Sequence, residues 1–240
     1  MIAIAILLVV AGVSAFIAVY RARAPRTVAD VLAKYGPDAR ARLKPFFDRA
    51  KVQYPSKRLA LLVFKQEKRV AVWADGHYIR AYPILAASGH AGPKLREGDY
   101  QVPEGLYRIE WLNPNSSYHL SMRVSYPNAF DRRMAVRENR TRLGGDIFMH
   151  GNAVSIGCVA IGDRAIEELF TLVAETGTSR TKLIIAPNDL RARGAVLYEG
   201  APLWIAELYR TIAAALTEFP LWMESDSTIG VRGMSKVAPR

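Results

Sequence analysis

Residues 147–163 read I-F-M-H-G-N-A-V-S-I-G-C-V-A-I-G-D, and the expectations for fold and chemistry both start from this stretch. It contains the only cysteine of the 240-residue chain and one of its four histidines. Cys158 follows His150 closely in the sequence. A cysteine of ordinary pKa, about 8.5, is only a few per cent thiolate at neutral pH, so it becomes a useful nucleophile when a base takes its proton. The imidazole of His150 is the natural candidate for that base.

The glycines of the stretch fit a catalytic interpretation. Gly157 allows the backbone to turn tightly just before the cysteine, and Gly151 relieves crowding beside the histidine. The backbone N–H groups of Gly157 and Cys158 are then candidates to bind a developing oxyanion.

A structural interpretation of the same cysteine stays open at this point. A lone cysteine often behaves as a small buried hydrophobic residue, and its apolar neighbours Ile156, Val159 and Ile161 suit a core strand. The Cys–His pair by itself does not choose between the two interpretations.

The stretch resembles the signature of the L,D-transpeptidase family with the YkuD-type catalytic domain, in which an H-G precedes a [ST]-H-G-C. Here the motif reads His150-Gly151 and then 155-S-I-G-C-158, with a shorter spacing and with Ile156 in place of the motif's histidine. This short form resembles the YafK-like branch, which includes a hydrolase that detaches lipoprotein from peptidoglycan. The resemblance covers residues 58–187 approximately and continues upstream in S-G-H-A-G-P-K from residue 88, P-E-G-L-Y from 103, N-P-N-S-S-Y-H-L-S from 113 and S-Y-P-N-A-F-D from 125.

The resemblance implies a small β-sandwich and acyl transfer without a cofactor. Cys158 would attack an amide of a peptidoglycan stem peptide, His150 would carry the proton, and Gly151 or a nearby carbonyl would orient the imidazole. Three further residues are predicted to contact substrate: Ser155, Asn152 and His119. Wall-linked lipoprotein is a second possible partner.

The composition is that of a folded domain with a basic surface. Half of the residues are apolar and the net charge is +11, which indicates an anionic partner such as phospholipid headgroups or the carboxylates of wall peptides. No zinc-finger, RNA-recognition or Walker pattern is present, so we predict no nucleic-acid partner. The single cysteine cannot form an intramolecular disulfide, and without CxxC or HExxH patterns we predict no metal site. A merely solvated basic surface is the alternative to an anionic partner.

Residues 1–20 are predicted to be a signal peptide or a membrane anchor. Residues 2–20 carry no charge and, as a helix, are long enough to cross a bilayer. The three arginines that follow at 21, 23 and 26 favour a cytoplasmic location of the downstream chain, against the wall-enzyme interpretation. We expect export, because the catalytic motif is the more specific signal. The chain is therefore placed in the periplasm, or on the outer face of the cytoplasmic membrane, of a Gram-negative-type bacterium.

Periodicity predicts a mostly β domain with flanking helices, an α+β fold. Residues 21–56 are expected to form two helices broken at Gly36-Pro37, which pack on the catalytic domain or space it from the membrane. The catalytic domain spans residues 57–187, with strands predicted at 59–64, 69–73, 77–83, 107–111, 120–124 and 182–186. His119 is expected on the polar face of the strand at 120–124, lining a groove or facing solvent. Residues 188–240 are a C-terminal helical extension and tail.

Two segments flanking the cysteine motif complete the prediction. Residues 128–145 read as a basic loop whose arginines 132, 133, 137 and 140 could pair with wall carboxylates. Asp163 reads as the N-cap of an amphipathic helix that ends at Gly177.

Three functions remain in competition at this stage. The first is an L,D-transpeptidase, the second a hydrolase or amidase of the same fold, and the third a wall-binding module without activity. Loss of the histidine at position 156 favours water over an amine as the acyl acceptor. A catalytic thiolate is expected to show a pKa below about 8.5, which would separate the enzymes from the binding module.

Overall fold

The computed structural model describes residues 25–195 and 197–221. The predicted signal or anchor at 1–20 and the tail after Ser225 lie outside these residues. Within the described ranges, no helix combines the length and the apolar character that a membrane span requires.

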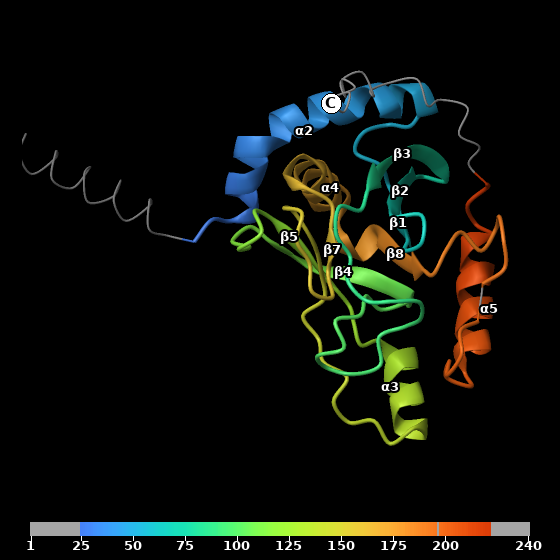
Figure 1. Ribbon diagram of the computed structural model, residues 1–240. Helices are drawn as coiled ribbons and strands as arrows, with labels where there is room; N and C mark the ends of the chain where they lie inside the picture. Colours follow the sequence, from blue (N-terminus) through green and yellow to red (C-terminus); the bar gives the residue numbers. More distant parts are fainter. Residues whose placement is uncertain (1–24, 196, 222–240) are drawn as a thin grey trace, which may run out of the picture.

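Eight strands form one curled, mixed sheet in the order β3-β2-β1-β8-β4-β5-β6-β7 (Figure 1). Two neighbouring pairs, β1–β8 and β6–β7, are parallel and the other pairs are antiparallel. The α+β fold class is thereby confirmed. The strands are β1 (Leu59–Phe64), β2 (Arg69–Ala74), β3 (His77–Pro83), β4 (Gly105–Asn113), β5 (Ser121–Val124), β6 (Phe148–His150), β7 (Val159–Ala160) and β8 (Thr181–Ala186).

Strand β4 joins two sections of this sheet. Its first residues, Gly105 to Arg108, pair with β8, and its later residues, Ile109 to Asn113, pair with β5. A register irregularity between Ile109 and Leu112 accompanies the change of partner, as expected where a strand bends. The short section β5-β6-β7 carries the cysteine motif.

Helices cover both faces of the larger section. Alternate residues of β1 belong to two separate apolar clusters, which is why this strand is buried along its whole length. Helices α2 (Val28–Ala50) and α4 (Asp163–Thr176) share one cluster, and α5 (Ile205–Leu216) covers the other face (Figure 1). Helix α2 thus packs on the sheet domain through Val31, Leu43 and Phe47.

Helix α2 corrects the expected break at Gly36-Pro37. It is one helix of 23 residues with Pro37 and Pro45 inside it. Each proline removes one backbone donor and favours a kink, and Figure 1 shows the helix bending along its length. Packing of its apolar face on α4 continues past the proline, so tertiary contacts outweigh the local penalty.

Two further predictions near the motif were wrong in detail. The basic segment 128–145 contains a helix, α3 (Ala129–Arg137), whose N-cap Asn128 forms a capping box with Asp131. The N-cap of α4 is Gly162, and Asp163 is the first helical residue. The Asp163 carboxylate instead accepts a hydrogen bond of 2.7 Å from the Asn152 N–H, which ties the helix to the loop before the cysteine.

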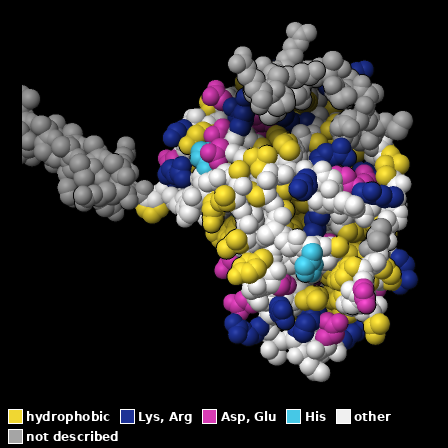
Figure 2. All heavy atoms as spheres, in the orientation of Figure 1, with side chains coloured by type: hydrophobic (Ala, Val, Ile, Leu, Met, Phe, Trp, Pro, Cys, Tyr) yellow, Lys and Arg dark blue, Asp and Glu magenta, His cyan; other side chains and the backbone are white. Residues whose placement is uncertain are grey.

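On the face in Figure 2, Lys and Arg side chains alternate with Asp and Glu and do not gather in one patch. Three of the arginines predicted to pair with wall carboxylates already have acidic partners within the protein. Arg140 pairs with Glu138, and Arg133 and Arg137 lie within 4.0 Å of Glu207.

Candidate active site

The parallel pairing of β6 and β7 brings the segments that carry His150 and Cys158 side by side, and extending its register by one residue predicts that the two side chains share a face. Met149 pairs with Val159 and His150 with Ala160, so Cys158 stands one step before β7, opposite Phe148. The Phe148 N–H donates to the Cys158 Sγ over 3.4 Å, which confirms that position. Side chains two residues apart on a strand share a face, and two steps amount to about 7 Å along it.

His150 is held as a base with its Nε2 lone pair available. The Nδ1–H donates to the Gly151 carbonyl oxygen at 2.6 Å, and a carbonyl can only accept, so the proton is on Nδ1. The ring lies 4.6 Å from the ring of Tyr118. Burial lowers the pKa of His150 and the carbonyl contact raises it in part, so the imidazole is neutral at pH 7. The Gly151 carbonyl oxygen, which was predicted as one of the groups that orient the imidazole, is the acceptor of this hydrogen bond.

Burial acts on the thiol in the opposite sense. Desolvation is the largest cause that raises the pKa of Cys158, the Asp146 carboxylate adds to it, and Lys94 and the Phe148 N–H oppose it. The thiol points to the Asp146 carbonyl oxygen at 3.7 Å. In the resting structure burial thus raises the pKa of the thiol. The pKa below about 8.5 that is expected of a catalytic thiolate stays a prediction for experiment. The described side chains form a neutral thiol and a neutral imidazole that are not yet hydrogen-bonded to each other.

Ser155 closes the turn that carries the nucleophile. Its Oγ accepts from the Cys158 N–H at 2.9 Å and its hydroxyl donates to the Cys158 carbonyl oxygen at 2.6 Å. Gly157 has φ +116°, a conformation that favours glycine, as the sequence predicted. Of the two expected oxyanion donors, the Cys158 N–H is occupied by Ser155, and no described residue accepts from the Gly157 N–H.

Gly151 and Asn152 shape the loop between base and nucleophile. A Cβ at Gly151 would meet Asp163 Oδ1 at 2.6 Å and the Tyr118 carbonyl oxygen at 2.8 Å, so the crowding that glycine relieves comes from the protein itself. Asn152 has φ +59°, and its Oδ1 accepts from the Ala153 N–H.

His119 lies beside this loop but is engaged elsewhere. It precedes β5 with φ +72° instead of standing on the strand's polar face. Its Nε2 lies 3.0 Å from Glu167 on α4, and its ring packs edge-on against Tyr35 of α2. These contacts direct the imidazole towards the helices.

Two exposed apolar residues, Ile156 and Tyr100, lie at the turn before Cys158. Ile156 is 74% exposed, and Tyr100 lies against the Gly157 turn, whose Cβ position is 3.6 Å from the Tyr100 carbonyl carbon. The sequence reasoning missed Tyr100, Tyr118 and Asp146. Tyr118 stands in the N-P-N-S-S-Y-H motif and could have been found from it, whereas nothing local marks Asp146. The described residues hold no cluster of three His, Cys, Asp or Glu side chains that could bind a metal ion.

Comparison with known proteins shows which family the sequence around this site matches. The model of the YkuD-type L,D-transpeptidase catalytic domain matches residues 58–185. The protein of Escherichia coli (strain K12) named "Putative L,D-transpeptidase YafK" is 33% identical over 117 residues, which cover 46% of this chain and 45% of that protein. The chain thus spans about half the length of the curated relatives it matches.

Solved structures show a similar but looser correspondence. The helical cell shape determining protein Pgp2 from Campylobacter jejuni is 20% identical with a TM-score of 0.42, covering 55% of this chain and 48% of that one. L,D-transpeptidase 1 from Mycobacterium tuberculosis is 15% identical with a TM-score of 0.32, covering 53% and 61%. The match of the family model over more than half of the chain, on the residues that form the Cys158–His150 site, shows that the chain belongs to the YkuD-type L,D-transpeptidase family.

Proposed function

We propose that the chain is a cysteine acyl-transfer enzyme that remodels the cell wall by acting on peptidoglycan stem peptides, without a cofactor. The observation that carries this proposal is the side-by-side placement of the His150 and Cys158 segments on β6 and before β7, with the imidazole proton on Nδ1 and Nε2 left as a base. The family membership supports the substrate class.

The proposed reaction has two steps. His150 Nε2 takes the Cys158 proton as Sγ attacks an amide carbonyl carbon, forming the S–C bond and an oxyanion. The imidazolium then protonates the departing amine as the C–N bond breaks, which leaves a thioester. In the second step His150 deprotonates an incoming amine or water, which attacks the thioester carbonyl, and the proton returns to the released thiolate.

The free Gly157 N–H is the first candidate to stabilise the oxyanion. Its neighbour, the Cys158 N–H, would join it if the Ser155 hydroxyl rotated away. Ser155 and Asn152 therefore act through the shape of the loop in this account, and their side chains contact substrate only secondarily.

Transfer to an amine is the principal proposal and hydrolysis the alternative. Two observations favour hydrolysis: position 156 carries an exposed isoleucine, and His119 is bound to Glu167 and does not replace the missing imidazole. A protein-linked substrate, such as wall-bound lipoprotein, fits the hydrolytic alternative, in which water accepts the acyl group. The non-catalytic wall-binding module is the third candidate and requires that Cys158 be dispensable.

The proposed location is outside the cytoplasmic membrane of a Gram-negative-type bacterium, either periplasmic or anchored to the membrane's outer face by residues 1–20. A reporter fused after Arg240 tests this location. An active extracytoplasmic reporter supports it, and an active cytoplasm-only reporter refutes it together with the substrate class.

Incubation of the full chain with purified peptidoglycan, followed by mass spectrometry of the fragments, tests the function. New peptide crosslinks indicate transfer, and shortened or lipoprotein-free peptides indicate hydrolysis. Unchanged wall material, or equal products from the Cys158→Ala protein, would contradict enzymatic function.

A further inference from the structure

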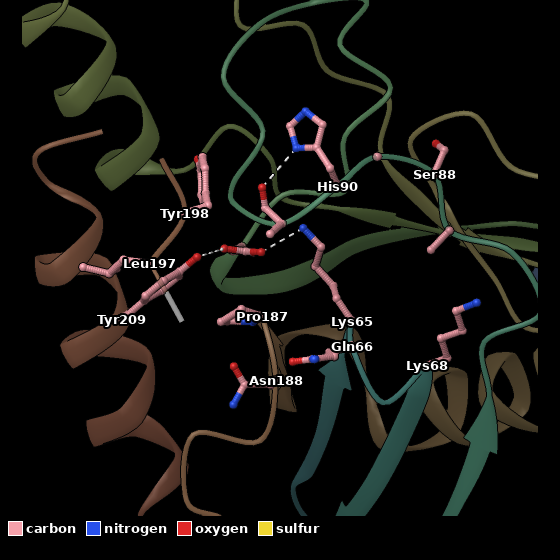
Figure 3. Close-up of a pocket in the computed structure, with 14 residues that line it drawn as sticks. Lys65, Gln66, Lys68, Ser88, His90, Pro187, Asn188, Leu197, Tyr198 and Tyr209 are labelled. Atoms are coloured by element: carbon pink, nitrogen blue, oxygen red, sulfur yellow. Dashed lines mark hydrogen bonds and ion pairs between the residues drawn. The ribbon is translucent and has the colours of Figure 1, made fainter. Parts of the chain in front are cut away.

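A cavity lined by none of the residues of the cysteine motif lies at the start of the loop formed by residues 88–103. Its volume is about 490 Å³, within the range of sites for small ligands. It is formed by the ends of β1 and β8, the start of the 88–103 loop, and α5 with the segment before it. In Figure 3, Tyr198 and Leu197 stand on one side of it and Ser88 and Lys68 on the other.

The charged floor of this cavity is already neutralised. The Lys65 ammonium donates to Glu104 Oε1 at 2.8 Å and to the carbonyl oxygens of Gly92 and Val102. The Tyr209 hydroxyl donates to the other Glu104 oxygen at 2.9 Å. Figure 3 shows Lys65 and Tyr209 reaching this carboxylate from two sides. The three groups satisfy one another, so the floor is a fixed support and not the recognising group.

The unused polar groups stand on the walls and rim. No described residue pairs with the Lys68 ammonium or with the Gln66 side-chain amide. His90 donates from Nδ1 to the Ala91 carbonyl oxygen, which leaves its Nε2 free. Glu104 is the only acidic side chain among the described lining residues, so Lys68 gives the cavity a positive excess. This combination suits a carboxylate with adjoining amide groups, as in a peptide.

The cavity is connected to the active site through Tyr100. The Ser88 hydroxyl, on the cavity wall, donates to the Tyr100 carbonyl oxygen at 2.7 Å. The Tyr100 backbone also lies against the Gly157 turn, where a Cβ at Gly157 would be 3.6 Å from the Tyr100 carbonyl carbon. Tyr100 thus contacts both the cavity wall and the turn that precedes Cys158, and an extended peptide of several residues is the kind of ligand that reaches from one to the other.

We propose that this cavity is a second peptide site, which binds a carboxylate of the wall peptide strand that Cys158 does not attack, with Lys68 as its cationic contact. The choice of ligand rests on the proposed function. The site itself rests on the cavity, its free donors and its link to Tyr100.

Calorimetric binding of a wall tetrapeptide to the full-length Cys158→Ala protein tests this site without any turnover. The Lys68→Ala change should weaken binding about threefold to fivefold, as for an exposed ion pair, and should have no effect on a tetrapeptide with amidated carboxylates. Ala91→Trp, which fills the cavity mouth, should weaken binding of both peptides. Lys57→Ala is the matched control, because it removes the same charge at the other end of β1 and should change nothing.

Unchanged tetrapeptide affinity in both the Lys68→Ala and the Ala91→Trp proteins would overturn the proposal. Cavity-dependent binding of the peptide-free disaccharide instead of the tetrapeptide would overturn the ligand class. Failure of the proposed catalytic function gives a different result from failure of this binding site. In that case wild-type protein would leave peptidoglycan unchanged, while the Lys68-dependent binding would persist.

Discussion

At the scale of single residues, burial keeps the two reacting groups neutral. It lowers the pKa of His150 and raises the pKa of Cys158, and both shifts disfavour a thiolate–imidazolium pair. In the proposed reaction the thiol therefore loses its proton to Nε2 during attack, and not before it. The enzyme in this account works by general-base catalysis with a protected, slowly oxidised cysteine.

The first prediction concerns the pH dependence of kcat/KM. Protonation of His150 removes the base, so activity should fall with decreasing pH only through a pKa below about 6.5. The thiol stays protonated to above about 8.5, so activity should remain flat up to that pH. Rates measured across pH, beside the pH dependence of iodoacetamide alkylation, check this. Alkylation that titrates with a pKa well below 8.5 would indicate a preformed ion pair instead.

The second prediction concerns Gly151. An alanine Cβ would clash with Asp163 Oδ1 and with the Tyr118 carbonyl oxygen, so Gly151→Ala should lower the free energy of unfolding by about 1–3 kcal/mol. Because the Gly151 carbonyl orients His150, kcat/KM should fall about tenfold or more. Gly194→Ala is the control, since its Cβ would meet nothing within 4 Å. Denaturant titration and initial rates measure both effects, and equal behaviour of the two variants would refute the argument.

At the scale of elements, one buried carboxylate joins three of them. Glu168 on α4 is 2% exposed and accepts from Arg42 Nε of α2, from Arg80 Nη1 of β3 at 2.8 Å, and from the Tyr82 hydroxyl of β3 at 2.7 Å. This network fixes α2 on the sheet domain despite its two internal prolines.

The third prediction follows from that network. Glu168→Gln leaves two arginines facing a neutral amide, so the free energy of unfolding should fall by about 2–4 kcal/mol. Asp48→Asn removes the exposed Lys44–Asp48 pair on the same helix and should cost less than about 1 kcal/mol. Chemical denaturation compares the two. Similar small losses would show that α2 is held by its apolar face alone.

At the scale of the whole molecule, local periodicity predicted the elements better than their assembly. The short apolar runs within residues 59–83 predicted β1, β2 and β3, and the apolar helical face that includes Leu208 and Ile212 predicted α5. These patterns report burial within one element, which the sequence states directly. The continuity of α2 and the helix α3 inside a basic segment were not predicted, because packing and a capping box overrode the proline and charge signals.

The motif named the candidate site residues, whose catalytic roles stay predictions, but it did not predict their hydrogen bonds or burial. The motif identified Cys158, His150 and the glycine turn. The parallel register of β6 and β7, the Ser155 hydrogen bonds that occupy the Cys158 N–H, and the engagement of His119 by Glu167 all depend on contacts distant in the sequence. The direction in which the fold shifts the thiol pKa could not be read from the motif for the same reason, since burial is a property of the assembled fold.

The central claim is that Cys158 carries the acyl group of a wall peptide, and intact-protein mass spectrometry tests it most directly. Wild-type protein mixed briefly with a wall tetrapeptide and quenched in acid should gain the mass of the peptide acyl group on the Cys158-containing fragment. His150→Ala should form this adduct more slowly by about two orders of magnitude or more, and Cys158→Ala should not form it at all. The account would be contradicted if wild-type protein modified peptidoglycan without forming the adduct, or if the Cys158→Ala protein formed the adduct.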